Sequence, residues 1–241
     1  MRTIRVYCAE ALASGQTLFL DEQASQHLSR VLRLPVGSVL ELFNGDGHAY
    51  QAQISALGKK QVQVQVLEQG VFQPASPLYS EIAVAISKAD KVDWIVQKAT
   101  ELGVNCISPV LTQRCDVKFD AQRGDKKQQR WQQIMLSACE QSGRNDVVQI
   151  NEVKSFADWL KQCQSPHKVI CHPRQARPLA QLAVSGQIAA CFGPEGGFSE
   201  AEIQLALANG FQPISLGPRI LRAETAPIAA LAIMQQLWGD Y

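Results

Sequence analysis

The feature that most constrains the fold of this chain is a pair of apolar segments near the C-terminus that each run into a Gly-Pro loop. Ile188–Phe192 is followed by GPEGGFS, residues 193–199. Pro213–Leu216 is followed by GPRILRAET, residues 217–225. Short apolar runs bounded by glycine and proline are typical of buried strands. We therefore predict two buried strands, each of which ends in one of these loops.

Two such loops side by side would form a pocket lined largely by main chain. Ligands of open α/β sheets lie at the carboxyl ends of the strands, and glycine lets backbone N–H and C=O groups approach a ligand closely. This arrangement suits a ligand with many hydrogen-bonding edges, such as an adenine. The alternative is that the two turns only reverse the chain. Arg219, Arg222 and Glu224 in the second loop favour a functional pocket.

The C-terminal two thirds of the chain alternates strand-like and helix-like segments. Strands are predicted at 81–87, 104–110, 147–150 and 169–171, and helices at 91–102, 126–140, 156–161 and from a Ser199 cap to Gly210. This alternation predicts a parallel, helix-covered sheet. A last helix, about Thr225 to Trp238, is apolar on every side from Ile228 to Met234. It is therefore expected to be covered by its own domain, by a partner subunit, or by both.

The first seventy residues have a different pattern, with short strands and tight turns. Val39–Phe43 leads into Asn44–Gly47, which is a strong hairpin signal, and residues 61–66 alternate strictly. One short helix with a stripe at His27, Leu28, Val31 and Leu32 fits before these strands. We predict a small barrel, with the domain boundary in the proline-containing segment 72–77.

Charge and cysteine content exclude several classes of protein. The net charge of the chain is +1, and residues 1–72 hold six basic and six acidic side chains, so overall charge indicates no polyanion partner. The seven cysteines include no Cys-x-x-Cys pair, which is typical of reduced thiols in a cytoplasmic protein. The spacing of Cys163, His167, Cys171 and His172 matches no common zinc pattern, so no metal is expected. No signal peptide and no membrane span are predicted.

The two loops carry a resemblance to a known family. GPEGGF(S) followed by LG-x-RILR-x-ET-A resembles the signature of SPOUT-class, trefoil-knotted RNA methyltransferases. The chain is most similar to the family that methylates N3 of a uridine in bacterial small-subunit ribosomal RNA. The segments HLSRVLR, KADKVDWIVQKATELGV and ACEQSGR extend this resemblance over the whole chain, although no role follows from it for Glu140, Gln141 or Arg144.

The resemblance implies a fold, a cofactor and partners. The fold would be an α/β, knotted (SPOUT) parallel-sheet methyltransferase domain at residues 73–241, preceded by a small PUA-like, RNA-binding β-barrel domain at residues 1–72. The cofactor would be S-adenosyl-L-methionine. The partners would be 16S ribosomal RNA, within the small ribosomal subunit, and a second copy of the chain in a homodimer.

The resemblance also implies site residues. Arg222 would stabilise the negative charge that spreads onto O2 and O4 when uridine N3 loses its proton. Glu224 would either orient this arginine or accept the proton. An ion pair that only stiffens the loop is the alternative for these arginines and Glu224. The residues expected to bind the cofactor are His172, Gly193, Pro194, Gly196, Gly197, Leu216, Gly217, Leu221 and Ala226. The residues expected to contact RNA are Arg2, Arg5, Arg30, Arg33 and Arg219.

Two other functions stay open from the sequence. The first is a SPOUT methyltransferase that acts on another ribosomal RNA base or on transfer RNA, because the loop motifs are shared within the class. The second is a non-catalytic RNA-binding protein with the same fold. For the arginines of the predicted N-terminal barrel, the alternative to RNA contact is an ordinary solvated surface position.

Overall fold

The structure is a computed structural model that describes residues 3–87, 91–115, 121–172 and 176–241. Its internal contacts divide the chain into two compact units, which we describe separately. The first unit is Met1–Ala75 together with Cys139–Val147, and the second is Ser76–Ala138 together with Val148–Tyr241. The boundary at 75/76 lies three residues beyond the predicted end of the first domain. The inclusion of Cys139–Val147 in the first unit was not predicted.

The first unit is built on a sheet that has five strands within the described residues, in the order β1-β3-β4-β5-β2. The pairs β3–β4, β4–β5 and β5–β2 are antiparallel, and β1 runs parallel to β3. Leu40, Leu42, Ile54 and Val64 fill its core because alternate side chains of each strand point inward. The strands are β1 (Arg5–Tyr7), β2 (Thr17–Phe19), β3 (Val39–Phe43), β4 (His48–Leu57) and β5 (Val62–Phe72).

The predicted short helix exists, but its apolar stripe is not buried as expected. Asp21 caps the helix α1 (Glu22–Gln26), which continues as a π-helical turn, η1 (His27–Val31). Leu28 is fully buried, whereas Val31 is 69% exposed. The reason is the wider turn, in which the Leu32 amide donates to the His27 carbonyl oxygen five residues earlier. The wider turn rotates the residues at its end away from the face on which α-helical spacing would place them.

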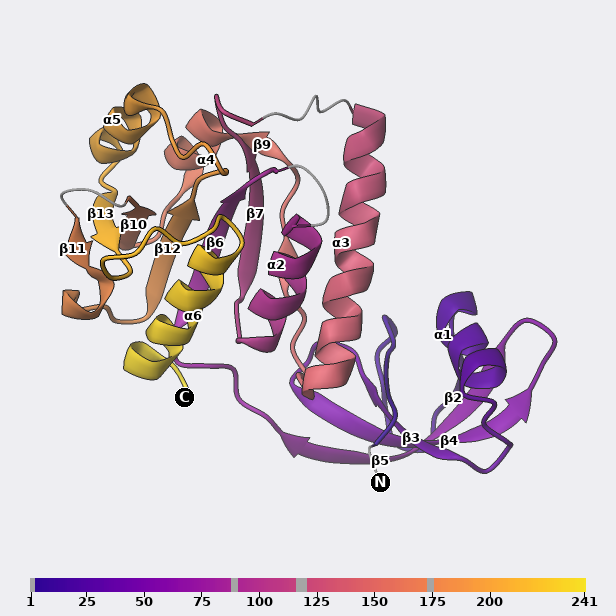
Figure 1. Ribbon diagram of the computed structural model, residues 1–241. Helices are drawn as coiled ribbons and strands as arrows, with labels where there is room; N and C mark the ends of the chain where they lie inside the picture. Colours follow the sequence, from indigo (N-terminus) through magenta and orange to yellow (C-terminus); the bar gives the residue numbers. More distant parts are fainter. Residues whose placement is uncertain (1–2, 88–90, 116–120, 173–175) are drawn as a thin grey trace. The chain divides into compact units, whose positions relative to one another are not determined.

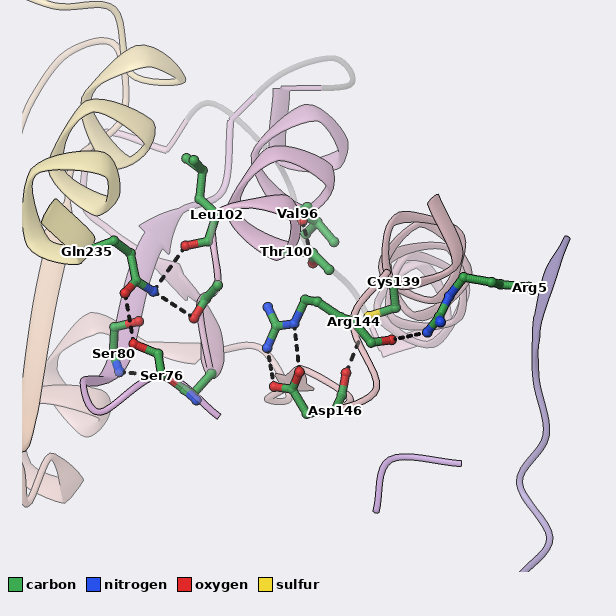
Figure 2. Close-up of polar contacts among 12 residues, drawn as sticks. Arg5, Ser76, Ser80, Val96, Thr100, Leu102, Cys139, Arg144, Asp146 and Gln235 are labelled. Carbon is green, nitrogen blue, oxygen red and sulfur yellow. Dashed lines mark hydrogen bonds and ion pairs between the residues drawn. The ribbon is translucent and has the colours of Figure 1, made fainter. Parts of the chain in front are cut away.

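The segment Cys139–Val147 is held in the first unit by polar contacts. The guanidinium of Arg5 donates to the Arg144 carbonyl oxygen at 2.8 Å (Figure 2). It also donates to Asn145 Oδ1 at 2.6 Å. The Tyr7 amide donates to Glu140 Oε1 at 3.2 Å. Arg144 in turn forms an ion pair with Asp146. The ACEQSGR motif therefore contributes structural contacts to this unit, which its sequence alone did not indicate.

The second unit is built on a parallel sheet in the order β11-β13-β10-β12-β6-β7-β8, with β9 also paired to β7. This confirms the predicted parallel, helix-covered sheet. The strands are β6 (Tyr79–Ala85), β7 (Cys106–Leu111), β8 (Gln149–Ile150), β9 (Lys154–Ser155), β10 (His167–Cys171), β11 (Arg177–Pro178), β12 (Gln187–Phe192) and β13 (Gln212–Ser215). The helices are α2 (Lys91–Glu101), α3 (Ala121–Ser142), α4 (Phe156–Gln162), η2 (Leu179–Gln181), α5 (Glu200–Ala208) and α6 (Thr225–Trp238).

Helices cover both faces of this sheet. Trp159 of α4 and Ala206 of α5 pack with Ala83, Ala189 and Cys191 on one face. Helices α2 and α6 lie side by side over the other face (Figure 1). Ser199 and Glu202 form the capping box that was predicted for α5. No helix among the described residues is long and apolar enough to cross a membrane.

Helix α6 is only partly enclosed within the single chain. Ala230, Leu231 and Met234 are buried, but the apolar residues between them, Ile228 and Ile233 among others, are only half-buried in the single chain. The single chain therefore covers α6 on one face, which packs against the sheet and α2. The expectation that a partner completes the coverage stays a prediction.

Candidate active site

Three strand ends meet at one edge of the parallel sheet. Strand β10 lies between β12 and β13, so the segments after these strands are neighbours. The His172 amide, just beyond β10, donates to the Ile214 carbonyl oxygen of β13 at 3.0 Å. A cavity of about 730 Å³ opens at this edge and is lined by all three segments. Gly193 and Gly217, which are 24 positions apart in the chain, both line it.

The first loop, Gly193–Ser199, is a tight turn that is held in place by its own hydrogen bonds and by a residue from another segment. The Gly197 amide donates to the Pro194 carbonyl oxygen at 2.8 Å, and Gly197 has a φ of +66° that favours glycine. A Cβ on Gly193 would lie 3.1 Å from the Phe198 nitrogen. Arg114 donates to the Gly196 carbonyl oxygen at 2.7 Å. The backbone of this loop is therefore fixed at the cavity wall.

The second loop, Gly217–Thr225, brings arginines to the same cavity. Gly217 has a φ of +94°, which turns the chain out of β13. The amides of Thr225 and Ala226 both donate to the Arg222 carbonyl oxygen and begin α6. Arg219 and Arg222 line the cavity with exposed side chains. Among the described residues, neither guanidinium has an ion pair or a side-chain hydrogen bond, so both are available to a ligand.

Almost all of the residues predicted to form the pocket line this cavity. Arg219 and Arg222 line it together with every residue predicted to bind the cofactor, namely His172, Gly193, Pro194, Gly196, Gly197, Leu216, Gly217, Leu221 and Ala226. Glu224 is not among the lining residues. Its Oε2 lies 3.4 Å from the Nζ atom of Lys91, so its ion-pair partner is a lysine rather than an arginine of its own loop.

Sequence reasoning missed several side chains of the cavity. Lys91 and Arg114 come from distant segments, before and after β7, and only the fold brings them to these loops. Lys91 lies in the KADKVDWIVQKATELGV segment, so the family resemblance was the one signal that pointed to it. Ile220 also lines the cavity and is 87% exposed.

The arginines predicted to contact RNA have different environments. The side chain of Arg5 is only 10% exposed and forms an ion pair with Glu41 at 2.9 Å. Its guanidinium also lies 5.0 Å from the centre of the Phe43 ring, so Arg5 holds the first unit together. Arg30 and Arg33 are exposed, and Arg33 adopts a left-handed φ of 54° at the end of the π-helical turn. Arg2 lies outside the described residues.

The described residues contain no group of three or more His, Cys, Asp or Glu side chains that is arranged to hold a metal ion. Burial raises the pKa of the Cys171 thiol, beside the cavity, to about 11, so this group is a neutral thiol near pH 7. The charged side chains that line the cavity are those of Lys91, Arg114, Glu195, Arg219 and Arg222.

Comparison with known proteins decides the family. A family model for RNA methyltransferase domains matches residues 74–235, and one for RNA methyltransferase PUA domains matches residues 20–67. The ribosomal RNA small subunit methyltransferase E of Buchnera aphidicola is 32% identical over 99% of this chain and 98% of its own length. The chain belongs to the small-subunit methyltransferase E family. The Bacillus subtilis member is 30% identical over 92% of this chain and 91% of its own length.

Solved structures of methyltransferase E proteins and related enzymes share this fold. A methyltransferase from Legionella pneumophila, solved in complex with S-adenosylmethionine, is 40% identical and superposes with a TM-score of 0.97 over all of both chains. A ribosomal RNA small subunit methyltransferase E from Neisseria gonorrhoeae, also bound to S-adenosylmethionine, is 40% identical with a TM-score of 0.93 over all of both chains. The expected pairing of a PUA domain with a parallel-sheet methyltransferase domain is thereby confirmed.

Proposed function

We propose that this protein transfers the methyl group of S-adenosylmethionine to N3 of a specific uridine in 16S ribosomal RNA. The observation that carries the proposal is the main-chain-lined cavity where β10, β12 and β13 end. Two structures that are 40% identical to this chain over their whole length contain S-adenosylmethionine. Methyltransferase E relatives are named for action on small-subunit ribosomal RNA.

The residues of the cavity fit this cofactor. Its volume of about 730 Å³ lies within the usual range for small-molecule sites. Glycines at 193, 196, 197 and 217 leave backbone N–H and C=O groups open to the hydrogen-bonding edges of an adenine. We assign cofactor binding to these glycines and to His172, Pro194, Leu216, Leu221 and Ala226. When bound, S-adenosylmethionine supplies a methyl group on a sulfonium, which a nitrogen nucleophile can displace.

Arg222 is the residue that we assign to the reacting base. Uridine N3 attacks well only after it loses its proton, and the negative charge then spreads onto O2 and O4. The Arg222 guanidinium lines the cavity and has no ion-pair or hydrogen-bond partner in the described part of the chain, so it can stabilise that charge. Glu224 lies at the start of α6 and is half-buried, so it can either position the neighbouring groups or accept the proton. Because N3 is on the pairing edge, the uridine must be unpaired or flipped out.

Recognition of the RNA is assigned to both units. We propose that Arg30 and Arg33 of the PUA-like unit and Arg219 of the second loop contact RNA phosphates, since their side chains are exposed. Arg5 is not part of this proposal, because its guanidinium is already bound to Glu41 and Asn145.

We also propose a homodimer, a trefoil knot in the catalytic domain, and action on the assembled small subunit in the cytoplasm. The half-buried side chains of Ile228, Ile233 and the 44% exposed Leu237 give α6 an apolar surface that a second copy would cover. Both the knot and the dimer follow from the resemblance to knotted methyltransferases.

The test is primer extension across small-subunit RNA from cells that lack this gene, with the complemented strain as the control. Methylation at N3 blocks base pairing and stops reverse transcriptase, so one stop should disappear and return on complementation. If every stop persisted, the uridine-N3 assignment would be wrong. Methylation of another base or of transfer RNA would then favour a related SPOUT activity, and the absence of S-adenosylmethionine binding in calorimetry would favour a non-catalytic RNA-binding protein.

A further inference from the structure

Lys91 lies between two carboxylates that come from the two different loops of the cavity. It is the first residue of α2, and its Nζ atom is 2.6 Å from Glu195 Oε1 in the first loop. The same Nζ atom is 3.4 Å from Glu224 Oε2 in the second loop. Lys91 also lines the cavity itself. A single ammonium group thus connects both loops to the beginning of α2.

Glu224 depends on this lysine more than Glu195 does. The Glu224 side chain is 19% exposed, compared with 48% for Glu195. Its Oε2 atom is buried and accepts no hydrogen bond. Within the part of the chain that the structure describes, the ion pair with Lys91 is the contact that offsets the loss of solvent around this oxygen. Removal of the lysine would therefore leave this buried oxygen without compensation.

Lys91 carries a positive charge at neutral pH. The hydrogen bond to Glu195 raises the pKa of Lys91, burial opposes this rise, and the charges of Glu195 and Glu224 add to it. The ammonium form is therefore present throughout the neutral range. Loss of this charge would remove the attraction that connects both loops to the beginning of α2.

We propose that Lys91 is a positioning residue for methyl transfer, which ties the two cavity loops together and holds the Glu224 carboxylate in place at the start of α6. This inference rests on the proposed methyltransferase function. It explains why no ion pair forms between Glu224 and Arg222, although they are two residues apart. With Lys91 holding the carboxylate, the Arg222 guanidinium keeps its hydrogen-bonding capacity for the base.

The test compares three variants in a methylation assay with small-subunit RNA. Lys91→Met keeps the length of the side chain and removes its charge, and Lys91→Arg restores the charge. Lys98→Met is the matched control, because Lys98 lies on the same helix and forms its own ion pair with Glu101 at 2.8 Å, but it does not line the cavity. Each variant is measured for kcat, for KM of the RNA, and for affinity of S-adenosylmethionine by calorimetry.

We expect Lys91→Met to lower kcat by up to about 100-fold, the size of effect that misplacement of a reacting group produces. The affinity for S-adenosylmethionine should change by less than this. Lys91→Arg should recover most of kcat, and Lys98→Met should resemble the wild type.

The proposal is overturned if Lys91→Met keeps the wild-type kcat, if Lys91→Arg recovers none of the lost kcat, or if Lys98→Met loses as much activity as Lys91→Met. It is also overturned if only KM rises, because that result would make Lys91 an RNA contact. Failure of the proposed function is distinguishable, since the wild-type protein itself would then methylate no uridine.

Discussion

The side-chain amide of Gln235 donates a hydrogen bond to the carbonyl oxygen of Gly103 over 3.1 Å, which joins the last helix to the turn after α2 (Figure 2). The same Nε2 donates to the Leu102 carbonyl oxygen at 3.1 Å, and Oε1 accepts from Ser76 Oγ at 2.9 Å. Gln235 is a fully buried polar residue of a mostly apolar helix. A Cβ on Gly103 would lie 2.6 Å from Nε2, so the glycine makes this close approach possible.

We expect Gln235→Leu to lower the free energy of unfolding by about 1–3 kcal/mol, because it leaves buried carbonyl oxygens without a donor. Urea denaturation measures the change. The control is Gln236→Leu, which makes the same substitution at the next, exposed position of α6 and should change stability little. Equal stability of the two variants would contradict a structural role for the buried amide.

Gly193→Ala should weaken binding of S-adenosylmethionine by at least about tenfold, a cost of about 1.4 kcal/mol. The added methyl group would lie 3.1 Å from the Phe198 nitrogen and 3.2 Å from its ring, so the first loop has to shift. The comparison is Gly210→Ala, where φ is +85° and the added Cβ meets no atom within 4 Å. That variant should lose about 1 kcal/mol of stability and keep cofactor affinity. Calorimetry that gives both variants the same affinity would disprove the role of Gly193.

Arg222→Ala should abolish most turnover while cofactor affinity stays within about tenfold of the wild type. The reason is that the guanidinium is assigned to charge that develops only in the transition state, where loss of one such donor costs about 10²–10³ in rate. Single-turnover methylation and calorimetry separate the two effects. Unchanged turnover would remove Arg222 from the mechanism.

Arg5 and Arg30 should respond in opposite ways to the same substitution. Arg5→Met removes contacts to Glu41, Arg144 and Asn145, so it should destabilise the protein by about 1–3 kcal/mol. Arg30→Met changes an exposed side chain, so it should weaken RNA binding and leave stability within about 0.5 kcal/mol. Urea melts and RNA titrations are compared for both variants. RNA affinity that is insensitive to Arg30 would argue against this face of the first unit as an RNA contact.

Tyr50 should make the stability of the first unit depend on alkaline pH. Burial, together with the hydrogen bond to Asp46 at 2.6 Å, raises the pKa of Tyr50 to about 12. A tyrosine in the unfolded chain ionises near pH 10, so the stability that this shift contributes is complete below about pH 10 and is lost as the pH rises to about 12. Tyr50→Phe should therefore flatten the fall of stability in this window, as measured by urea melts at stepped pH. Asp46→Asn should flatten it only in part, because burial remains. Parallel curves for all three proteins would refute the assignment.

Local sequence determined the elements and the identity of the cavity loops. The Gly-Pro loops after 188–192 and 213–216, the capping box at Ser199 and the alternation of strands and helices are properties of neighbouring residues, and all are present in the structure. Because parallel strands end at a common edge, the pattern also placed Gly193 and Gly217 in one cavity. The resemblance to methyltransferases was carried by these same residues.

Only the tertiary structure decided which charges meet. Lys91 forms ion pairs with Glu195 and Glu224, which are more than a hundred residues away in the sequence. Arg5 donates a hydrogen bond to Asn145, and Gln235 donates to carbonyl oxygens at the end of α2. The π-helical turn that exposes Val31 could not be predicted from the sequence either, since the spacing argument assumes 3.6 residues per turn. Periodicity reports which face of an element is buried, but it contains no information about the long-range partner that a polar side chain reaches once the sheet is assembled.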